Sequence, residues 1–320
     1  MGEKISIVVP CYNEENVLPA FFQEIRKVIA RMPDLDFEFM LIDDGSSDGT
    51  LDVIKAYARQ NEIVKYISFS RNFGKEAAIY AGLRNASGNY VVIMDADLQD
   101  PPALLPEMYR HVSGGEYDSV ATRRVTRQGE PRMRSFFARQ FYKIMNRLSS
   151  VDMVDGARDY RIMNRRFVNA LLEMGEYNRF SKGLFGWVGY RTKWLEYKNI
   201  ERIAGETKWS FWSLVRYSIE GIIAFSTAPL VISAVFGVIM SGLSMVSLIA
   251  IVVRKMMFGD PVMGWASIIS VILLIGGLLL VTLGIIGQYL AKTYLEVKHR
   301  PIYICGETNL PDSDGAIPCK

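Results

Sequence analysis

Two aspartates separated by one residue give the clearest chemical signal in this sequence. Residues 91–94 (Val-Val-Ile-Met) are typical of a buried strand, and Asp95, Ala96 and Asp97 follow them directly. Once the chain leaves a sheet, both carboxylates can turn toward one ligand. Mg²⁺ and Mn²⁺ prefer such oxygen ligands and usually complete their coordination with phosphate oxygens and water. An Asp-x-Asp pair also occurs in ordinary solvated turns, so the rest of the sequence must decide between the two interpretations.

Polar side chains also follow the other apolar runs in the first hundred residues. In chain order they are Pro10, Tyr12, Glu14, Asp43, Asp44, Arg71 and Lys75. A carboxylate at Asp44 could accept a hydrogen bond from the edge of a nucleobase, and the ring of Tyr12 could stack on its face. A metal ion at Asp97 would neutralise a diphosphate, to which Arg123 or Lys208 could add positive charge as it leaves. These residue types suit a nucleoside diphosphate that must be held and released.

Other classes of function lack their sequence signals. The chain contains neither Gly-x-Gly-x-x-Gly nor Gly-x-x-x-x-Gly-Lys-[Ser/Thr], which argues against dinucleotide redox chemistry and P-loop chemistry. The two histidines, His111 and His299, lie near no nucleophile pattern. A formal net charge of +3 does not indicate a nucleic-acid partner. The three cysteines show neither metal-ligand spacing nor a disulfide framework, as expected on a reducing cytosolic face.

Alternating strands and helices must position these residues. Apolar runs predict strands over residues 5–9, 37–42, 64–69, 91–94 and 118–121. Helical patterns predict a first helix that Asn13 could cap at its start and that ends near residue 30, and further helices over 51–59, 76–86 and 103–112. The alternation predicts an α/β fold around a parallel sheet with right-handed crossovers, whose carboxyl ends bind ligands. Residues 155–161 are predicted to form a turn-rich stretch.

Two long stretches without charged residues follow. No Asp, Glu, Lys or Arg occurs over residues 222–253 or 261–291. Because about 20 apolar residues span a bilayer, each stretch is long enough for a transmembrane helix. The alternative is a buried helical hairpin in a soluble core. Two spans put both chain ends on one side, and most of the flanking lysines and arginines favour the cytoplasmic side, although Arg254 and Lys255 weaken that argument.

The segment between the α/β region and the spans is basic and aromatic. Residues 123–147 carry many arginines with apolar residues at helical spacing, which is typical either of a helix on a membrane surface or of an ordinary core-facing helix. Residues 209–212 (Trp-Ser-Phe-Trp) suit the headgroup level. Basic groups here could guide anionic headgroups. Glycines in the two spans favour self-association into a homo-oligomer, or reflect ordinary membrane-helix composition.

Four segments in order resemble the motif set of family-2 glycosyltransferases. They are residues 8–15 (VVPCYNEE), 43–50 (DDGSSDGT), 70–75 (SRNFGK) and 95–102 (DADLQDPP). Each motif alone is weak, but four in order at strand ends, with paired spans behind them, are specific. Within that family the chain resembles the polyisoprenyl-phosphate glycosyltransferases, relatives of dolichol-phosphate mannose synthase, and most closely the bactoprenol glucosyltransferase branch. The likeness covers about residues 4–303.

The resemblance implies a GT-A catalytic domain followed by two transmembrane helices. It implies transfer of a hexose, with inversion, from a nucleotide sugar such as UDP-glucose to undecaprenyl phosphate. The reaction would use Mg²⁺ or Mn²⁺ on the cytoplasmic face of the inner (plasma) membrane. The expected segments are 1–208 (catalytic domain with the basic interfacial helix), 209–228 (juxtamembrane), 229–253 and 264–290 (spans) and 291–320 (cytosolic tail).

The resemblance also assigns site residues. Those expected to hold the nucleotide sugar are Pro10, Tyr12, Glu14, Asp44, Lys75, Asp95, Ala96, Arg123 and Lys208. Asp97 is the expected direct metal ligand, with Asp95 on the ribose or a metal-bound water. The family's catalytic carboxylate falls on Asp159 as first choice and on Asp155 as second. A phosphomonoester is largely dianionic at neutral pH and needs little deprotonation, so this carboxylate could instead orient the acceptor or stabilise positive charge at the anomeric carbon.

Three alternatives remain open from the sequence. The sugar and carrier could be mannose on a dolichol-type lipid, or an amino sugar on undecaprenyl phosphate. A processive polysaccharide synthase is disfavoured, because only two spans follow the catalytic domain and no Gln-x-x-Arg-Trp motif occurs. A non-catalytic membrane scaffold that binds nucleotide is disfavoured by the intact aspartates Asp95, Asp97 and Asp159.

Overall fold

The computed structural model describes residues 2–125, 154, 156–197, 222–223, 226–258 and 264–311. Several sequence-based expectations fall on other residues. Asp155, Lys208, the predicted juxtamembrane aromatics and all but the first residues of the predicted basic helix lie outside the described part of the chain.

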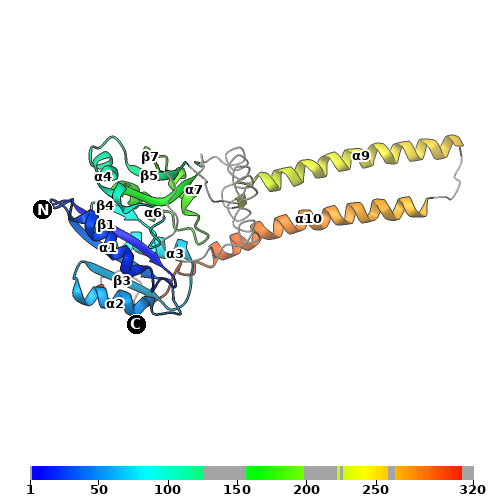
Figure 1. The fold of residues 1–320 in the computed structure, drawn as a ribbon. Helices are drawn as coiled ribbons and strands as arrows, with labels where there is room; N and C mark the ends of the chain where they lie inside the picture. The colour runs from blue at the N-terminus through cyan, green and yellow to red at the C-terminus, as the bar shows by residue number, and fades with distance from the viewer. Residues whose placement is uncertain are drawn as a thin grey trace.

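The described residues form an eight-stranded sheet in the order β7-β5-β6-β4-β1-β2-β3-β8 (Figure 1). The strands are β1 (Lys4–Cys11), β2 (Asp36–Asp43), β3 (Val64–Phe69), β4 (Tyr90–Ile93), β5 (Ser119–Arg124), β6 (Ala157–Asn164), β7 (Thr192–Tyr197) and β8 (Cys305–Thr308). Strands β1 to β4 pair in parallel, as the sequence predicts, and their carboxyl ends lie at one edge. The α/β fold class is confirmed.

The sheet is mixed rather than parallel throughout. β6 is antiparallel to both β4 and β5, and β8 is antiparallel to β3. The prediction of a turn-rich stretch over residues 155–161 is wrong from Ala157 onward, because these residues begin β6. The charged residues Arg158, Asp159 and Arg161 interrupt any apolar run in β6, so its strand character depends on partners elsewhere in the chain.

Helices cover both faces of the sheet. α1 (Leu18–Ile29), α2 (Thr50–Gln60) and α4 (Leu105–Ser113), which follows the short 3₁₀ helix η1 (Pro102–Leu104), pack on one face in a core that includes Phe21, Ile54 and Met108. α3 (Lys75–Asn85), α6 (Arg165–Glu173) and α7 (Ser181–Trp187) pack on the other. Gly82 of α3 lies so close to Val8 of β1 that a Cβ atom would be 2.2 Å from a Val8 methyl carbon. α3 therefore lies directly on β1, and its first residue, Lys75, is near the carboxyl end of β1.

Two long apolar helices project from the sheet domain (Figure 1). α9 spans Ala228–Phe258 and α10 spans Trp265–Val297, so both are longer than the predicted spans. The windows Ala228–Ser247 and Leu274–Val297 have mean hydropathies of 2.1 and 2.0, and 0% of either is buried. The alternative of a buried helical hairpin in a soluble core is therefore wrong for these windows. Each helix is long and apolar enough to cross a membrane.

The chain returns to the sheet after α10. β8 pairs with β3 at the sheet edge, so part of the segment expected to be a tail belongs to the sheet domain. Just before β8, the buried ring of Tyr303 stacks on Phe69 with the centroids 4.8 Å apart. Cys305 is disulfide-bonded, which the spacing of the cysteines did not indicate because a disulfide depends on proximity in space.

We expect Tyr303→Ala to lower the apparent unfolding temperature by about 5–10 °C, because it removes a buried aromatic ring and the anchor of β8. Thermal unfolding of the purified protein in detergent measures this. Ile304→Ala is the matched control, since Ile304 is the adjacent residue and 47% exposed. An equal change in both variants would contradict the anchoring role of Tyr303.

Candidate functional site

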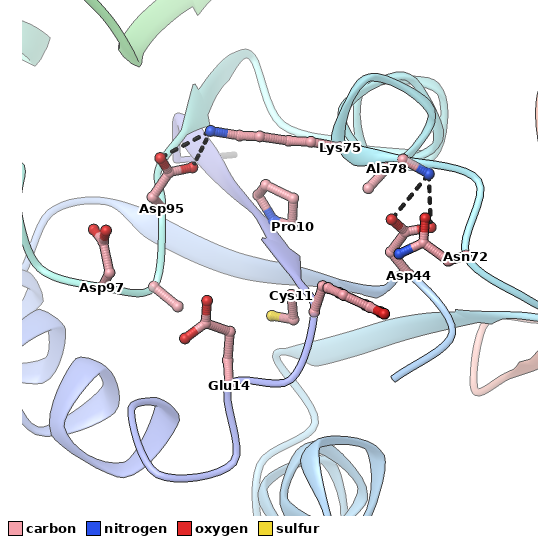
Figure 2. Close-up of a pocket in the computed structure, with 12 residues that line it drawn as sticks. Pro10, Cys11, Glu14, Asp44, Asn72, Lys75, Ala78, Asp95 and Asp97 are labelled. Carbon is pink, nitrogen blue, oxygen red and sulfur yellow. Dashed lines mark hydrogen bonds and ion pairs between the residues drawn. The ribbon is translucent and has the colours of Figure 1, made fainter. Parts of the chain in front are cut away.

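An open pocket of about 360 Å³ lies at the carboxyl ends of β1, β2 and β4, beside the start of α3 (Figure 2). Its lining consists of Pro10, Cys11, Tyr12, Glu14, Asp44, Asn72, Gly74, Lys75, Ala78, Asp95, Ala96 and Asp97. This one pocket brings together most of the expected nucleotide- and metal-binding residues. Its volume is in the range typical of small-ligand sites.

Asp44 forms one wall of the pocket and is nearly buried. Its carboxylate accepts hydrogen bonds from the main-chain N–H groups of Phe73 (2.7 Å) and Gly74 (2.9 Å). Gly74 has a φ of +97°, a conformation that favours glycine, and this directs its N–H at the carboxylate. Burial raises the pKa of Asp44 to about 6 despite these hydrogen bonds. The carboxylate therefore has a fixed orientation and an unusually low tendency to ionise.

Hydrogen bonds between two loops position Tyr12 and Glu14. The side-chain oxygen of Asn13 accepts from the Ser47 N–H (2.9 Å), and Glu15 accepts from the Gly49 N–H (2.7 Å). The expectation that Asn13 caps α1 is wrong, because α1 begins at Leu18 and Asn13 bonds the neighbouring loop instead. The ring of Tyr12 is 41% exposed at the pocket, where it can stack on a planar ligand.

Asp95 and Asp97 lie side by side on the wall opposite Asp44 (Figure 2). Asp97 accepts from the Gln99 N–H at 3.1 Å, and the intervening Leu98 is buried with a φ of +55°. A branched side chain rarely adopts that conformation, so the surrounding contacts must hold the loop.

Arg158 of β6 supplies those contacts. Its guanidinium donates to Asp100 (2.9 Å) and to the side chain of Gln99 (3.0 Å). The hydroxyl of Tyr197 in β7 also donates to Asp100, which is buried. This network fixes the loop that carries Asp95 and Asp97 against the strand that carries Asp159.

Lys75 joins the two carboxylate-bearing segments. Its ammonium lies 2.7 Å from Asp95 Oδ1 and 2.6 Å from Asp159 Oδ2. Burial disfavours the charged forms of Lys75 and Asp159, but the attraction between their opposite charges outweighs this effect. The two carboxylates hold the pKa of Lys75 above its usual value, and Lys75, with Lys182 nearby, holds the pKa of Asp159 below its usual value. Asp159 is therefore an ionised, ion-paired carboxylate at neutral pH.

The aspartates fit a metal ion only if a ligand shares it. Among the described residues, no group of three or more His, Cys, Asp or Glu side chains could hold a metal ion. Asp95 and Asp97 supply two carboxylates, and Lys75 already places a cation on one of them. Mg²⁺ is commonly bound by one or two carboxylates together with phosphate oxygens and water. The residues present fit a divalent ion bound together with a phosphate-bearing ligand.

The other expected residues have different positions. Asp159 is absent from the pocket lining but contacts it through Lys75. Arg123 of β5 is also absent from the lining, and its guanidinium pairs with Glu196 of β7 at 2.5 Å. Asp155 and Lys208 lie outside the described residues.

Sequence reasoning missed the residues that support the site. Asp100 belongs to the motif of residues 95–102, and that motif is a signal that could have identified it. Arg158 and Tyr197 have no local signal, because their partner is about sixty or more residues away. Arg161 of β6 also has no local signal. Its guanidinium is buried and lies 3.5 Å from the centre of the Phe185 ring, and burial lowers its pKa to about 9.

The chain is similar to known transferases over nearly its whole length. Residues 6–172 match the family described as glycosyl transferase family 2. A Bacillus subtilis (strain 168) protein, provisionally named glycosyltransferase CsbB, is 43% identical over 97% of this chain and 93% of its own. The bactoprenol glucosyl transferase of Shigella phage SfV is 38% identical over 94% of this chain and 97% of its own.

A solved structure of similar architecture is glucosyl-3-phosphoglycerate synthase from Mycobacterium tuberculosis, in complex with Mn²⁺, UDP-glucose and phosphoglyceric acid. It has a TM-score of 0.48 and 21% identity, and the match covers 69% of this chain and 78% of that one.

We expect Arg158→Met to cost about 3–5 kcal/mol of stability, because it leaves the buried carboxylate of Asp100 without its cation. Thermal unfolding measures the loss. Arg123→Met is the matched control, since it breaks an exposed pair worth at most about 1 kcal/mol. Equal losses in the two variants would show that the Arg158 pair does not support the loop.

The raised pKa of Asp44 predicts a pH dependence of stability in the absence of nucleotide. Because the folded-state pKa of about 6 exceeds the ordinary value of 3.8, protonation stabilises the folded protein below about pH 4, and that contribution is lost as the pH rises through 6. Wild-type protein should therefore lose up to about 3 kcal/mol relative to Asp44→Asn between pH 4 and 7. A stability difference that stays constant over this range would contradict the prediction.

Proposed function

Because the chain belongs to glycosyl transferase family 2, we propose that it moves glucose from UDP-glucose to undecaprenyl phosphate. The observation that carries this proposal is the pocket that Asp44, Lys75 and the Asp95–Asp97 pair line together, with Asp159 ion-paired to Lys75 beside it. The chain is a glycosyltransferase, and relatives similar over most of its length are named bactoprenol glucosyl transferases. Those names support glucose as the transferred sugar and undecaprenyl phosphate as the lipid acceptor.

The pocket's two walls suit the two ends of a nucleotide sugar. The fixed carboxylate of Asp44 would accept from the base, and the exposed ring of Tyr12 would stack on it. Pro10 and Glu14 line the space beside them. The diphosphate would then lie toward Asp95 and Asp97 on the opposite wall.

Asp97, with Asp95, would hold a Mg²⁺ or Mn²⁺ ion together with the diphosphate. When bound, the ion would neutralise the negative charge that develops on the departing nucleoside diphosphate. The choice between the two metals does not follow from two carboxylates alone.

The acceptor needs orientation more than activation. An oxygen of the lipid phosphate would form the new bond to the anomeric carbon as the bond from that carbon to the diphosphate breaks. The departing diphosphate takes the electron pair, and the configuration inverts. The phosphate is largely dianionic at neutral pH, and Asp159 is ion-paired with Lys75. We therefore assign to Asp159 the positioning of Lys75 and of the acceptor, with removal of a proton playing a minor part.

The apolar helices suit the lipid substrate. The phosphate of undecaprenyl phosphate lies at headgroup depth with its tail in the bilayer, so catalysis must occur at the membrane surface. α9 and α10 would span the inner membrane, with the catalytic domain on the cytoplasmic face. Arg123, Lys208 and the basic segment 123–147 would attract anionic headgroups and the departing diphosphate.

The function is tested with purified full-length protein, undecaprenyl phosphate and a panel of labelled nucleotide sugars. We expect glucolipid from UDP-glucose, and no product in excess chelator. Mannolipid or an amino-sugar lipid would replace the donor assignment by one of the sequence-based alternatives. No glycolipid from any donor, or full activity in chelator, would contradict the proposal.

Two substitutions separate the roles of the carboxylates in that assay. Asp97→Ala should lose about 10³-fold or more in turnover, because it removes the direct metal ligand. Asp159→Asn should keep more activity and lose about 10²-fold, because it removes an orienting group. Asp52→Asn, an exposed carboxylate on α2, is the control and should match wild type. Equal residual rates for the first two variants would contradict this ranking.

A further inference from the structure

The C-terminal end of α10 is hydrogen-bonded to the catalytic domain. Glu296 accepts from the main-chain N–H groups of Tyr177 (3.0 Å) and Asn178 (3.0 Å), and from the Asn178 side-chain amide (3.2 Å). Lys292, one turn earlier, donates to the side-chain oxygen of Asn178 at 3.1 Å. We call these four residues the α10 latch. They join a helix that would span the membrane to the loop between α6 and α7.

The latched loop leads directly to the element that carries Lys75. α7 begins at Ser181, three residues after Asn178. The main-chain N–H of Ser181 donates to Glu76 at 2.9 Å, and its hydroxyl donates to the same oxygen. Glu76 follows Lys75 in the first turn of α3, and the Lys75 ammonium holds Asp95 and Asp159. A few consecutive contacts therefore connect α10 to the reaction centre.

A second attachment reaches α3 through the chain that precedes it. After α10, the carbonyl of Ile304 accepts from the Ser70 N–H at 3.0 Å, and Tyr303 stacks on Phe69. Ser70 begins the loop of residues 70–75 that ends at Lys75. The end of α10 is thus fixed to the start of α3 through residues before and after Lys75.

The length of α10, together with the polar side chains of Lys292 and Glu296, places the latch outside the hydrocarbon. Its 33 residues extend about 50 Å, whereas the hydrocarbon core of a bilayer is about 30 Å thick. Lys292 and Glu296 lie in the last two turns, where polar side chains meet the headgroup layer. Near the same end, the hydroxyl of Tyr289 donates to the carbonyl of Ser226, just before α9, at 2.6 Å. The two helices are therefore tied together at the level where they meet the catalytic domain.

We infer that Glu296 is a positioning residue for lipid substrate: through the α10 latch it fixes the height and orientation of Lys75 and Asp159 above the membrane. This rests on the proposed function and adds to it the means by which the pocket meets an acceptor confined to one plane. Among the described residues, no hydrogen bond or ion pair joins the latch to β1, β2 or Asp44, which form the nucleotide half of the pocket. Loss of the latch should therefore impair use of the lipid and spare use of the nucleotide sugar.

The experiment compares two reactions of the full-length protein in vesicles that contain undecaprenyl phosphate. One is transfer of glucose to the lipid, and the other is hydrolysis of UDP-glucose, in which water replaces the lipid. We expect Glu296→Gln to raise the KM for the lipid about tenfold, because it replaces the charged carboxylate that accepts the latch hydrogen bonds and so weakens them. The KM for UDP-glucose and the rate of hydrolysis should stay within about twofold of wild type.

Three further variants make the result specific. Glu24→Gln makes the same chemical change in an exposed pair with Lys27 on α1 and should leave both reactions unchanged. Asn178→Ala should raise the lipid KM as Glu296→Gln does, and the double variant should be no worse than the more affected single variant, because both break one contact. Lys292→Met weakens the latch more mildly and serves if Glu296→Gln does not fold.

Two outcomes would overturn the inference, and a third would overturn the proposed function instead. An unchanged lipid KM in Glu296→Gln and Asn178→Ala would overturn the inference. Equal losses of transfer and hydrolysis, accompanied by a lower unfolding temperature, would also overturn it, because the latch would then only stabilise the fold. Failure of the wild-type protein to form any glycolipid would instead overturn the proposed function.

Discussion

One ammonium group between two carboxylates determines how the site is assembled. Asp95 follows β4, Asp159 lies in β6, and Lys75 begins α3, so three separate segments meet at one point of charge balance. Without the cation, two carboxylates at the edge of a pocket would repel each other, and one would tend to bind a proton. Lys75 prevents this by balancing the charge of both carboxylates, so the two groups keep fixed positions at the edge of the pocket.

The supporting structure holds those segments in register. The antiparallel strand β6 lies between β4 and β5, and adjacent residues on it face opposite sides of the sheet. Arg158 therefore binds the loop with Asp100 on one face while Asp159 meets Lys75 on the other. A single strand thus sets the separation between the loop of Asp95 and Asp97 and the Lys75–Asp159 ion pair. The pocket lies at the carboxyl ends of the parallel strands β1, β2 and β4, and the inserted strand β6 carries Asp159 beside it.

The sheet domain and the apolar helices form a continuous structure. α10 is bonded to the loop before α7 and is followed by a strand that completes the sheet edge (Figure 1). An edge strand covered in this way presents fewer unpaired main-chain groups. For the membrane-held acceptor that we propose, such attachments matter, because a loosely tethered pocket would sample many heights and orientations relative to a phosphate at fixed depth.

The parallel half of the fold, most of the pocket and the two apolar helices could be predicted from local sequence patterns. Apolar runs that end abruptly at Pro10, Asp44 and Asp95 predict strands whose carboxyl ends share an edge, so those residues could be brought together without knowing any contact. The remaining features depend on contacts between segments that are distant in the sequence. β6 carries Arg158, Asp159 and Arg161, which hide its strand character because their partners lie far along the chain. The bond from Glu296 to Asn178 spans 118 residues for the same reason. Local patterns report burial and turn chemistry, whereas charge pairing between distant segments depends on where the fold brings them.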